Sequence, residues 1–169
     1  MPRRLPVGSI EFSTVSPAGT TVRSMAIPAV ITLVTLGVRD VAAATRFYAA
    51  LGFPQSSASV AGEVSFFRTA GGLFGVYGAD DLAADAGLPP APTSGFRGVS
   101  VAINVESRDA VDEAIATAAD AGATIVKPPQ ATEWGGYHAY FADPDGHAWE
   151  IAHNPSWPLD SAGLAQLPE

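Results

Sequence analysis

Hydrophobic residues recur along the first half of this chain with two periods, one typical of strands and one typical of helices. A β-branched run over residues 30–36 predicts a strand, because Val, Ile and Thr fit a pleated sheet. Apolar residues then recur at three- and four-residue steps over residues 41–51, which predicts a helix capped by Asp40 and ended at Gly52. Three short strand candidates follow, at residues 55–60, 63–69 and 73–77, and the first of them is the weakest.

The same order of elements returns after residues 87–95, whose Pro and Gly content predicts a linker. The elements predicted beyond it are a strand, a helix that begins after Ser107 or Asp109, and three strands: 99–105, 107–121, 123–126, 137–142 and 147–153. Pro128 and Pro129 are expected to end the third of these elements, and residues 143–146 to form the turn between the last two. The chain therefore contains an internal repeat of two modules of about sixty residues each.

Composition separates an N-terminal extension and a C-terminal tail from the two modules. Residues 1–28 are rich in Pro, Ser, Thr and Gly, and they predict an extension that is either a flexible arm or a strand for a partner's sheet edge. Met25 is an alternative start. The modules are expected at residues 29–86 and 96–155, followed by a tail over 156–169 whose role the sequence leaves open.

Residue usage excludes several kinds of chemistry. The 169 residues include no Cys, which excludes disulfides, thiolate metal sites and a Cys nucleophile. Acidic residues outnumber basic ones by 17 to 9, and no basic cluster exceeds Arg3-Arg4, which argues against a nucleic-acid partner. No run approaches the roughly 18 apolar residues that cross a bilayer, and no apolar segment of a signal peptide follows Arg4. We therefore expect no membrane partner and a cytoplasmic protein.

Two stretches of sequence carry a family resemblance. The first is residues 34–40 with Phe47-Tyr48 and residues 51–53; the second is residues 140–151, with an Asp-Pro-Asp-Gly turn and a strand ending in Trp-Glu-Ile. Over roughly residues 29–155 the chain thereby resembles the vicinal-oxygen-chelate superfamily, which includes glyoxalase I, extradiol dioxygenases, fosfomycin resistance enzymes and bleomycin resistance proteins. The resemblance implies an α+β fold in which two βαβββ modules form an eight-stranded open cup, and it implies a homodimer. It does not supply the chemistry, because this fold serves metal enzymes and metal-free binding proteins alike.

Metal enzymes of that superfamily hold a divalent metal on the first and last strands of each module. Those four positions fall here on Leu33, Val76 (Tyr77 if the register slips by one), Ser100 and Glu150. Only Glu150 is an ordinary ligand, and one hydroxyl with one carboxylate falls short of three protein ligands. The expected cofactor is therefore none; a rearranged metal site would use Glu150 and His138.

Glu150 has two interpretations. Strand alternation predicts that it points to the face opposite His147 and His153, so that if Glu150 faces the cavity the two histidines point away from it. In the cavity Glu150 would act as a general base or bind a cation, which makes it the one candidate catalytic residue. Alternatively it is a structural carboxylate, hydrogen-bonded to Ser100, Thr35 or the Tyr137 hydroxyl.

The segment before the penultimate strand is expected to form a lip of the cavity. Trp134 and Tyr137 offer flat apolar surfaces, and Gly135-Gly136 let the backbone approach a ligand. The alternative is that Trp134 plugs the core. The residues expected to bind the ligand are Leu33, Thr35, Val76, Ser100, Ala102, Trp134, Tyr137 and Glu150.

The function expected from these observations is that of a glyoxalase-like or bleomycin-resistance-like protein that binds a small, cationic molecule without a catalytic metal. The alternatives are a metal-dependent lyase, isomerase or dioxygenase with a displaced site, or an interaction domain with a collapsed cavity. The identity of the ligand lies outside the sequence.

Overall fold

A computed structural model describes residues 27–90, 92 and 95–168. The predicted extension, residues 1–28, therefore lies almost wholly outside the described residues. Residues 31–169 form one unit, distinct from residues 1–30. None of its described helices has the length and apolar character needed to cross a bilayer.

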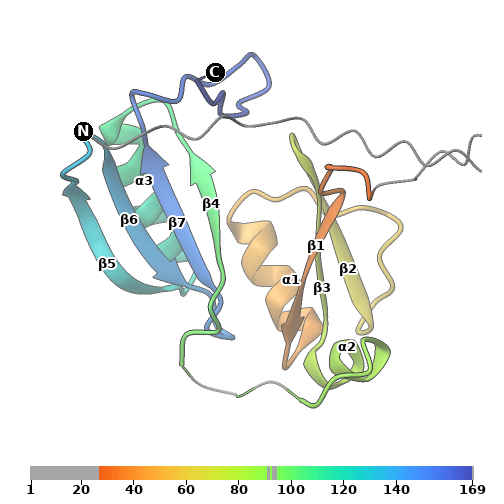
Figure 1. Ribbon diagram of the computed structural model, residues 1–169. Coiled ribbons are helices and arrows are strands. Elements are labelled where there is room, and N and C mark those ends of the chain that lie inside the picture. Colours follow the sequence, from red (N-terminus) through yellow and green to blue (C-terminus); the bar gives the residue numbers. More distant parts are fainter. Residues whose placement is uncertain (1–26, 91, 93–94, 169) are drawn as a thin grey trace, which may run out of the picture. The chain divides into compact units, whose positions relative to one another are not determined.

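The first module folds around a three-stranded sheet with the order β1-β3-β2 (Figure 1). Strand β1 (Leu33–Val38) runs parallel to β3 (Gly72–Gly78), which pairs antiparallel with β2 (Val64–Thr69). Helix α1 (Val41–Ala50) begins where the Asp40 carboxylate accepts a hydrogen bond from the Ala43 amide, and Gly52 follows it with φ of 90°. These two capping predictions are confirmed. The short helix α2 (Ala79–Asp85) follows β3.

The weak strand predicted over residues 55–60 is reduced to two isolated bridges, Gln55 to Phe67 and Val60 to Val64. Its serines bond the backbone nearby instead of extending a ladder, since the Ser56 hydroxyl accepts from the Ala58 amide. The described residues thus form seven strands where the resemblance implies eight. The α+β class with two sheets agrees with the expected fold.

The second module folds around a four-stranded sheet with the order β4-β7-β6-β5. Its elements are β4 (Ser100–Asn104), α3 (Arg108–Asp120), β5 (Thr124–Ala131), β6 (Tyr137–Ala142) and β7 (Ala148–His153). Ser107, not Asp109, caps α3. The prediction that Pro128 and Pro129 end β5 is wrong: the strand continues with shifted register, because an edge strand can lack ladder donors.

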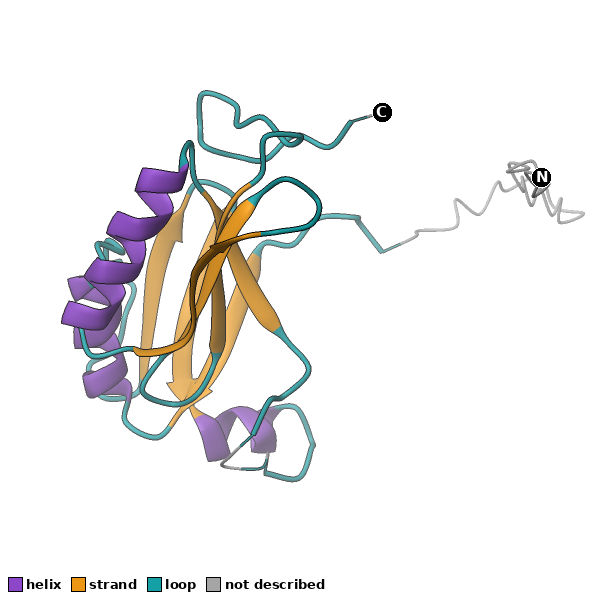
Figure 2. Ribbon diagram, turned by 90° about the vertical axis from the view of Figure 1, so that its left-hand side faces the viewer, coloured by secondary structure: helices purple, strands orange, loops and turns teal. Residues whose placement is uncertain are grey.

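Both long helices cover the same side of the sheets, whereas the short helix α2 packs against the other side at the end of β1, beside Gly37 (Figure 2). The helix side holds one continuous core to which both modules contribute, and Val38, Phe47, Tyr48, Val111, Phe141 and Trp149 are among its members. We call the side of each sheet opposite the long helices its open face. Side-chain alternation places Leu33, Thr35 and Tyr77 on the open face of the first sheet, and Ser100, Ala102 and Glu150 on that of the second.

A buried hydrogen bond joins the two modules through that core. The Tyr48 hydroxyl of α1 donates to Oδ2 of Asp143 at 2.6 Å and accepts from Nε1 of Trp149 at 3.2 Å. Tyr48 and Asp143 are almost fully buried, so a broken bond would leave a desolvated carboxylate unpaired. Burial, followed by the neighbouring Asp143, raises the pKa of Tyr48 far above its usual value.

The 143–146 turn continues this connection at the protein surface. Oδ1 of Asp143 accepts hydrogen bonds from the amides of Asp145 and His147, which fixes the turn. Nε of Arg39, from the end of β1, lies 2.8 Å from Oδ1 of Asp145. The His147 ring bonds the Gly37 carbonyl through Nε2 at 2.8 Å. The turn that carried the family resemblance thus fastens the second module to the first.

Tyr48→Phe should lower the free energy of unfolding by about 1–3 kcal/mol, because it removes the hydroxyl donor from a buried carboxylate. Urea unfolding followed by circular dichroism measures this change. Tyr77→Phe is the matched control, since no hydrogen bond of the Tyr77 hydroxyl occurs in the described ranges. Equal stabilities of the two variants would contradict the role given to Tyr48.

Candidate functional site

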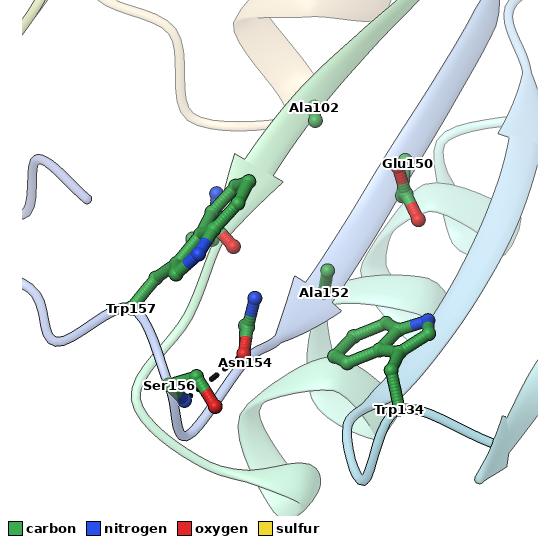
Figure 3. Close-up of a pocket in the computed structure, with 8 residues that line it drawn as sticks. Ala102, Trp134, Glu150, Ala152, Asn154, Ser156 and Trp157 are labelled. Atoms are coloured by element: carbon green, nitrogen blue, oxygen red, sulfur yellow. Dashed lines mark hydrogen bonds between the residues drawn. The ribbon is translucent and has the colours of Figure 1, made fainter. Parts of the chain in front are cut away.

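A pocket of about 470 Å³ opens on the second sheet (Figure 3). It is lined by two alanines, two tryptophans and four polar residues: Ala102, Ala152, Trp134, Trp157, Asn104, Glu150, Asn154 and Ser156. Glu150 is the one charged residue in this set. The pocket thus combines small, aromatic and hydrogen-bonding surfaces around a single carboxylate.

Strand alternation builds the floor of the pocket. Ala102 of β4 and Glu150 of β7 are register partners, and both point to the open face. Ala152 lies two residues beyond Glu150 on the same face, and its small side chain leaves room above the sheet. Trp149 and Ile151 alternate with these residues and lie in the helix-side core.

Trp134 reaches the pocket from the loop before β6. Its ring lies directly over Gly136: a Cβ at residue 136 would fall 1.6 Å from the Trp134 ring. The indole remains half exposed and stands edge-on to the His138 ring, with 6.1 Å between ring centroids. Trp134 therefore lines the pocket and does not plug the core. The absence of a side chain at Gly136 leaves the space that the Trp134 ring occupies.

Trp157 comes from the tail after β7, whose role the sequence leaves open. The tail is folded around Asp160, which accepts hydrogen bonds from the amides of Ala162 and Leu164. A Cβ at Gly71 would come within 3.2 Å of the Leu164 side chain, so the tail packs beside the β2–β3 hairpin. Trp157 lies outside both repeats, and no motif could have marked it as a pocket residue.

Glu150 is one end of a chain of hydrogen bonds across the open face. Nδ1 of His138, on β6, lies 2.7 Å from Oε1 of Glu150. Nε2 of the same ring lies 2.8 Å from Nζ of Lys127, on β5. Burial and the neighbouring Glu150 raise the pKa of Tyr140 to about 12. The expected partners of Glu150 (Ser100, Thr35 or Tyr137) are wrong; its partner is His138.

Three of the predicted ligand-binding residues meet in this pocket: Ala102, Trp134 and Glu150. Ser100 shares the open face of the second sheet but does not line the pocket, and Leu33 and Thr35 lie on the first sheet.

Two of the predicted ligand-binding residues point the other way. Val76 is fully buried in the helix-side core, so the open-face position on β3 belongs to Tyr77. Tyr137 also turns to the helix side, where its hydroxyl donates to Asp112 of α3 at 3.1 Å and Arg108 lies over its ring. The prediction that Val76 and Tyr137 line the cavity is therefore wrong. Strand register, which one residue reverses, explains the first error.

The side chains present do not fit the metal site of the superfamily's metal enzymes. The four corresponding open-face positions hold Leu33, Tyr77, Ser100 and Glu150. Only Glu150 has a side chain that commonly binds a metal ion. Within the described residues no group of three His, Cys, Asp or Glu side chains could hold an ion. The fallback pair of Glu150 and His138 is also a poor fit, because hydrogen bonds already engage both ring nitrogens of His138.

Comparison with known proteins agrees with this architecture. The family model described as "Glyoxalase/Bleomycin resistance protein/Dioxygenase superfamily" matches residues 30–151, well over half of the chain. The chain belongs to this superfamily. No curated protein matches it.

Solved structures of this superfamily resemble the chain along most of their length. A glyoxalase-related enzyme from Fulvimarina pelagi is 30% identical with a TM-score of 0.74, over 82% of this chain and 98% of that one. A glyoxalase/bleomycin resistance protein/dioxygenase family enzyme from Burkholderia phytofirmans PsJN is 26% identical with a TM-score of 0.65, over 74% and 98%. Lactoylglutathione lyase from Agrobacterium tumefaciens, at 19% identity, TM-score 0.59, and coverage of 79% and 100%, shares the fold alone.

Gly136→Ala should displace the Trp134 ring from its place beside His138, because the added Cβ and the ring cannot occupy the same volume. The backbone of Gly136 does not have a positive φ, so alanine adds no left-handed backbone strain there. The measurement is the NMR chemical shift of the His138 ring protons, which the edge-on indole perturbs. The same substitution in a Trp134→Ala background should leave those shifts unchanged, and a shift of equal size in both backgrounds would contradict this account.

Proposed function

We propose that this protein binds a small cationic molecule in the pocket at Glu150 and that it does so without a resident metal ion. The observation that carries the proposal is a pocket whose lining combines a lone carboxylate with two tryptophans. A cation gains from both groups, since the face of an indole attracts positive charge as a carboxylate does.

The size and composition of the pocket support a small organic ligand. A volume of about 470 Å³ is within the usual range for small-molecule sites, which combine an apolar lining with few polar groups. Its lining also includes the hydrogen-bonding residues Asn104, Asn154 and Ser156. Trp134 and Trp157 are both substantially exposed, so each has apolar surface that a ligand in the pocket would bury.

Lys127 does not cancel the attraction for a cation. Its ammonium contacts the far nitrogen of His138, so the imidazole separates it from the Glu150 carboxylate. The side chain of Glu150 is 20% exposed and lines the pocket, whereas Lys127 does not. A ligand in the pocket therefore meets the carboxylate first. The net charge of −8 also favours the approach of cations to the protein.

Choline and its uncharged analogue dimethylbutanol test the proposal as a pair of equal shape. Glu150→Gln should weaken choline binding about tenfold, equivalent to 1.4 kcal/mol, and leave dimethylbutanol unchanged. Glutamine keeps an oxygen that can accept the hydrogen bond from Nδ1 of His138, so the substitution removes charge with little change in structure. NMR titration measures both affinities.

Trp157→Ala should also weaken choline, and Leu167→Ala, in the exposed part of the same tail, is its matched control. Equal binding of choline and dimethylbutanol to the unmodified protein would refute the preference for cations. If no compound of a broader cation panel shifts a single pocket resonance, the binding function itself is refuted.

Metal content separates this proposal from a metal-dependent lyase, isomerase or dioxygenase. Protein produced in medium supplemented with zinc, manganese, iron and nickel should contain far less than one ion per chain, because the open face offers a single ordinary ligand. Elemental analysis of the purified protein gives the answer. A content near one ion per chain that disappears in Glu150→Gln would favour the enzyme instead.

A further inference from the structure

We propose that Lys127 is a reactive amine that forms an imine with small aldehydes, with His138 as the base that removes its proton and Glu150 as the group that orients His138. This site goes beyond the binding function proposed above and does not depend on it. The arrangement is a nucleophile, a base and an orienting carboxylate joined by two short hydrogen bonds.

The three side chains come from three adjacent strands. β5 pairs with β6, and β6 pairs with β7, so Lys127, His138 and Glu150 form a line across the open face of the second sheet. The side chains of His138 and Glu150 are 12% and 20% exposed, and Lys127 is half buried. Trp134 stands edge-on to the His138 ring. Neighbouring side chains therefore restrict the water around the base, which strengthens its hydrogen bonds.

The geometry of β5 around Lys127 is irregular. The pairing of β5 with β6 shifts register both before and after Lys127, and two prolines follow it. Such irregularities re-aim a side chain, and they are over-represented beside active sites. Here the regular partner of Lys127 is Tyr140, yet its ammonium reaches the His138 ring. The strand distortion and the hydrogen-bond chain are two separate observations at the same residue.

The chemistry requires no other co-reactant. Nε2 of His138 takes one proton from the Lys127 ammonium, and the carboxylate of Glu150 stabilises the imidazolium that results. The free amine attacks the carbonyl carbon, a C–N bond forms, and a proton moves from nitrogen to oxygen to give a carbinolamine. His138 returns its proton to the hydroxyl, which leaves as water, and a protonated imine remains. One aldehyde and one ammonium group thus give one iminium group and one water.

Reductive trapping tests the proposal on the whole protein. Propionaldehyde with sodium cyanoborohydride at neutral pH should label Lys127 at least about tenfold faster than it labels N-acetyl-lysine amide, a modest value for general base assistance. Lys127 is the one lysine in the sequence, so peptide mass spectrometry separates its label from that of the chain's α-amine. In urea the advantage should disappear, since unfolding separates the three residues.

His138→Gln should reduce labelling to the rate of the reference amine, and its rate should recover only as the pH becomes alkaline. A residue with a merely structural role would not move this pH profile. Labelling of folded wild-type protein at the reference rate or slower overturns the proposal. So does unchanged labelling in His138→Gln with an unchanged melting temperature; if that variant does not fold, the comparison of native with urea-unfolded wild type decides.

Discussion

The hydrogen bond between Tyr48 and Asp143 is the constraint on which the rest of the structure depends. It joins a helix of the first module to the turn that precedes the last strand of the second, and both residues are almost fully buried. A carboxylate in that position is tolerable only while its oxygens are satisfied. Asp143 therefore holds the 143–146 turn with one oxygen and Tyr48 with the other, which couples turn geometry to module packing.

This coupling also determines what the open face can do. Trp149 donates to the Tyr48 hydroxyl and packs against Phe74 of the first module and Phe141 of its own sheet. Because side chains alternate along β7, a fixed Trp149 on the helix side fixes Glu150 on the open side. The 143–146 turn therefore affects the pocket indirectly, because it holds β7 in the register that presents Glu150.

Hydrophobic periodicity and capping residues were enough to predict α1, α3 and most strands, because each depends on local sequence. They failed where tertiary context decides. The serines near Gln55 compete with a ladder, and Pro128-Pro129 lie on an edge where lost donors cost little. At the site, the family resemblance marked Glu150 and the aromatic segment before β6 marked Trp134, whereas a register error of one residue misplaced Val76. Trp157 and Lys127 could not be found from sequence, since a folded tail and a distorted strand bring them to the open face.

The three histidines show how this chain uses a fold that its metal-binding relatives use differently. His147 contacts the Gly37 carbonyl and so belongs to the connection between modules. His153 bonds the Val105 carbonyl through Nδ1 at 3.2 Å. His138 alone lies on the open face, where Lys127 and Glu150 engage both ring nitrogens. A metal ion would need a ring nitrogen of His138 as a ligand and would have to displace one of these hydrogen bonds. Proton transfer from Lys127 instead uses the hydrogen bond that is already present. The same imidazole that fits a metal poorly is therefore well placed to take a proton from a lysine while the carboxylate stabilises its charged form.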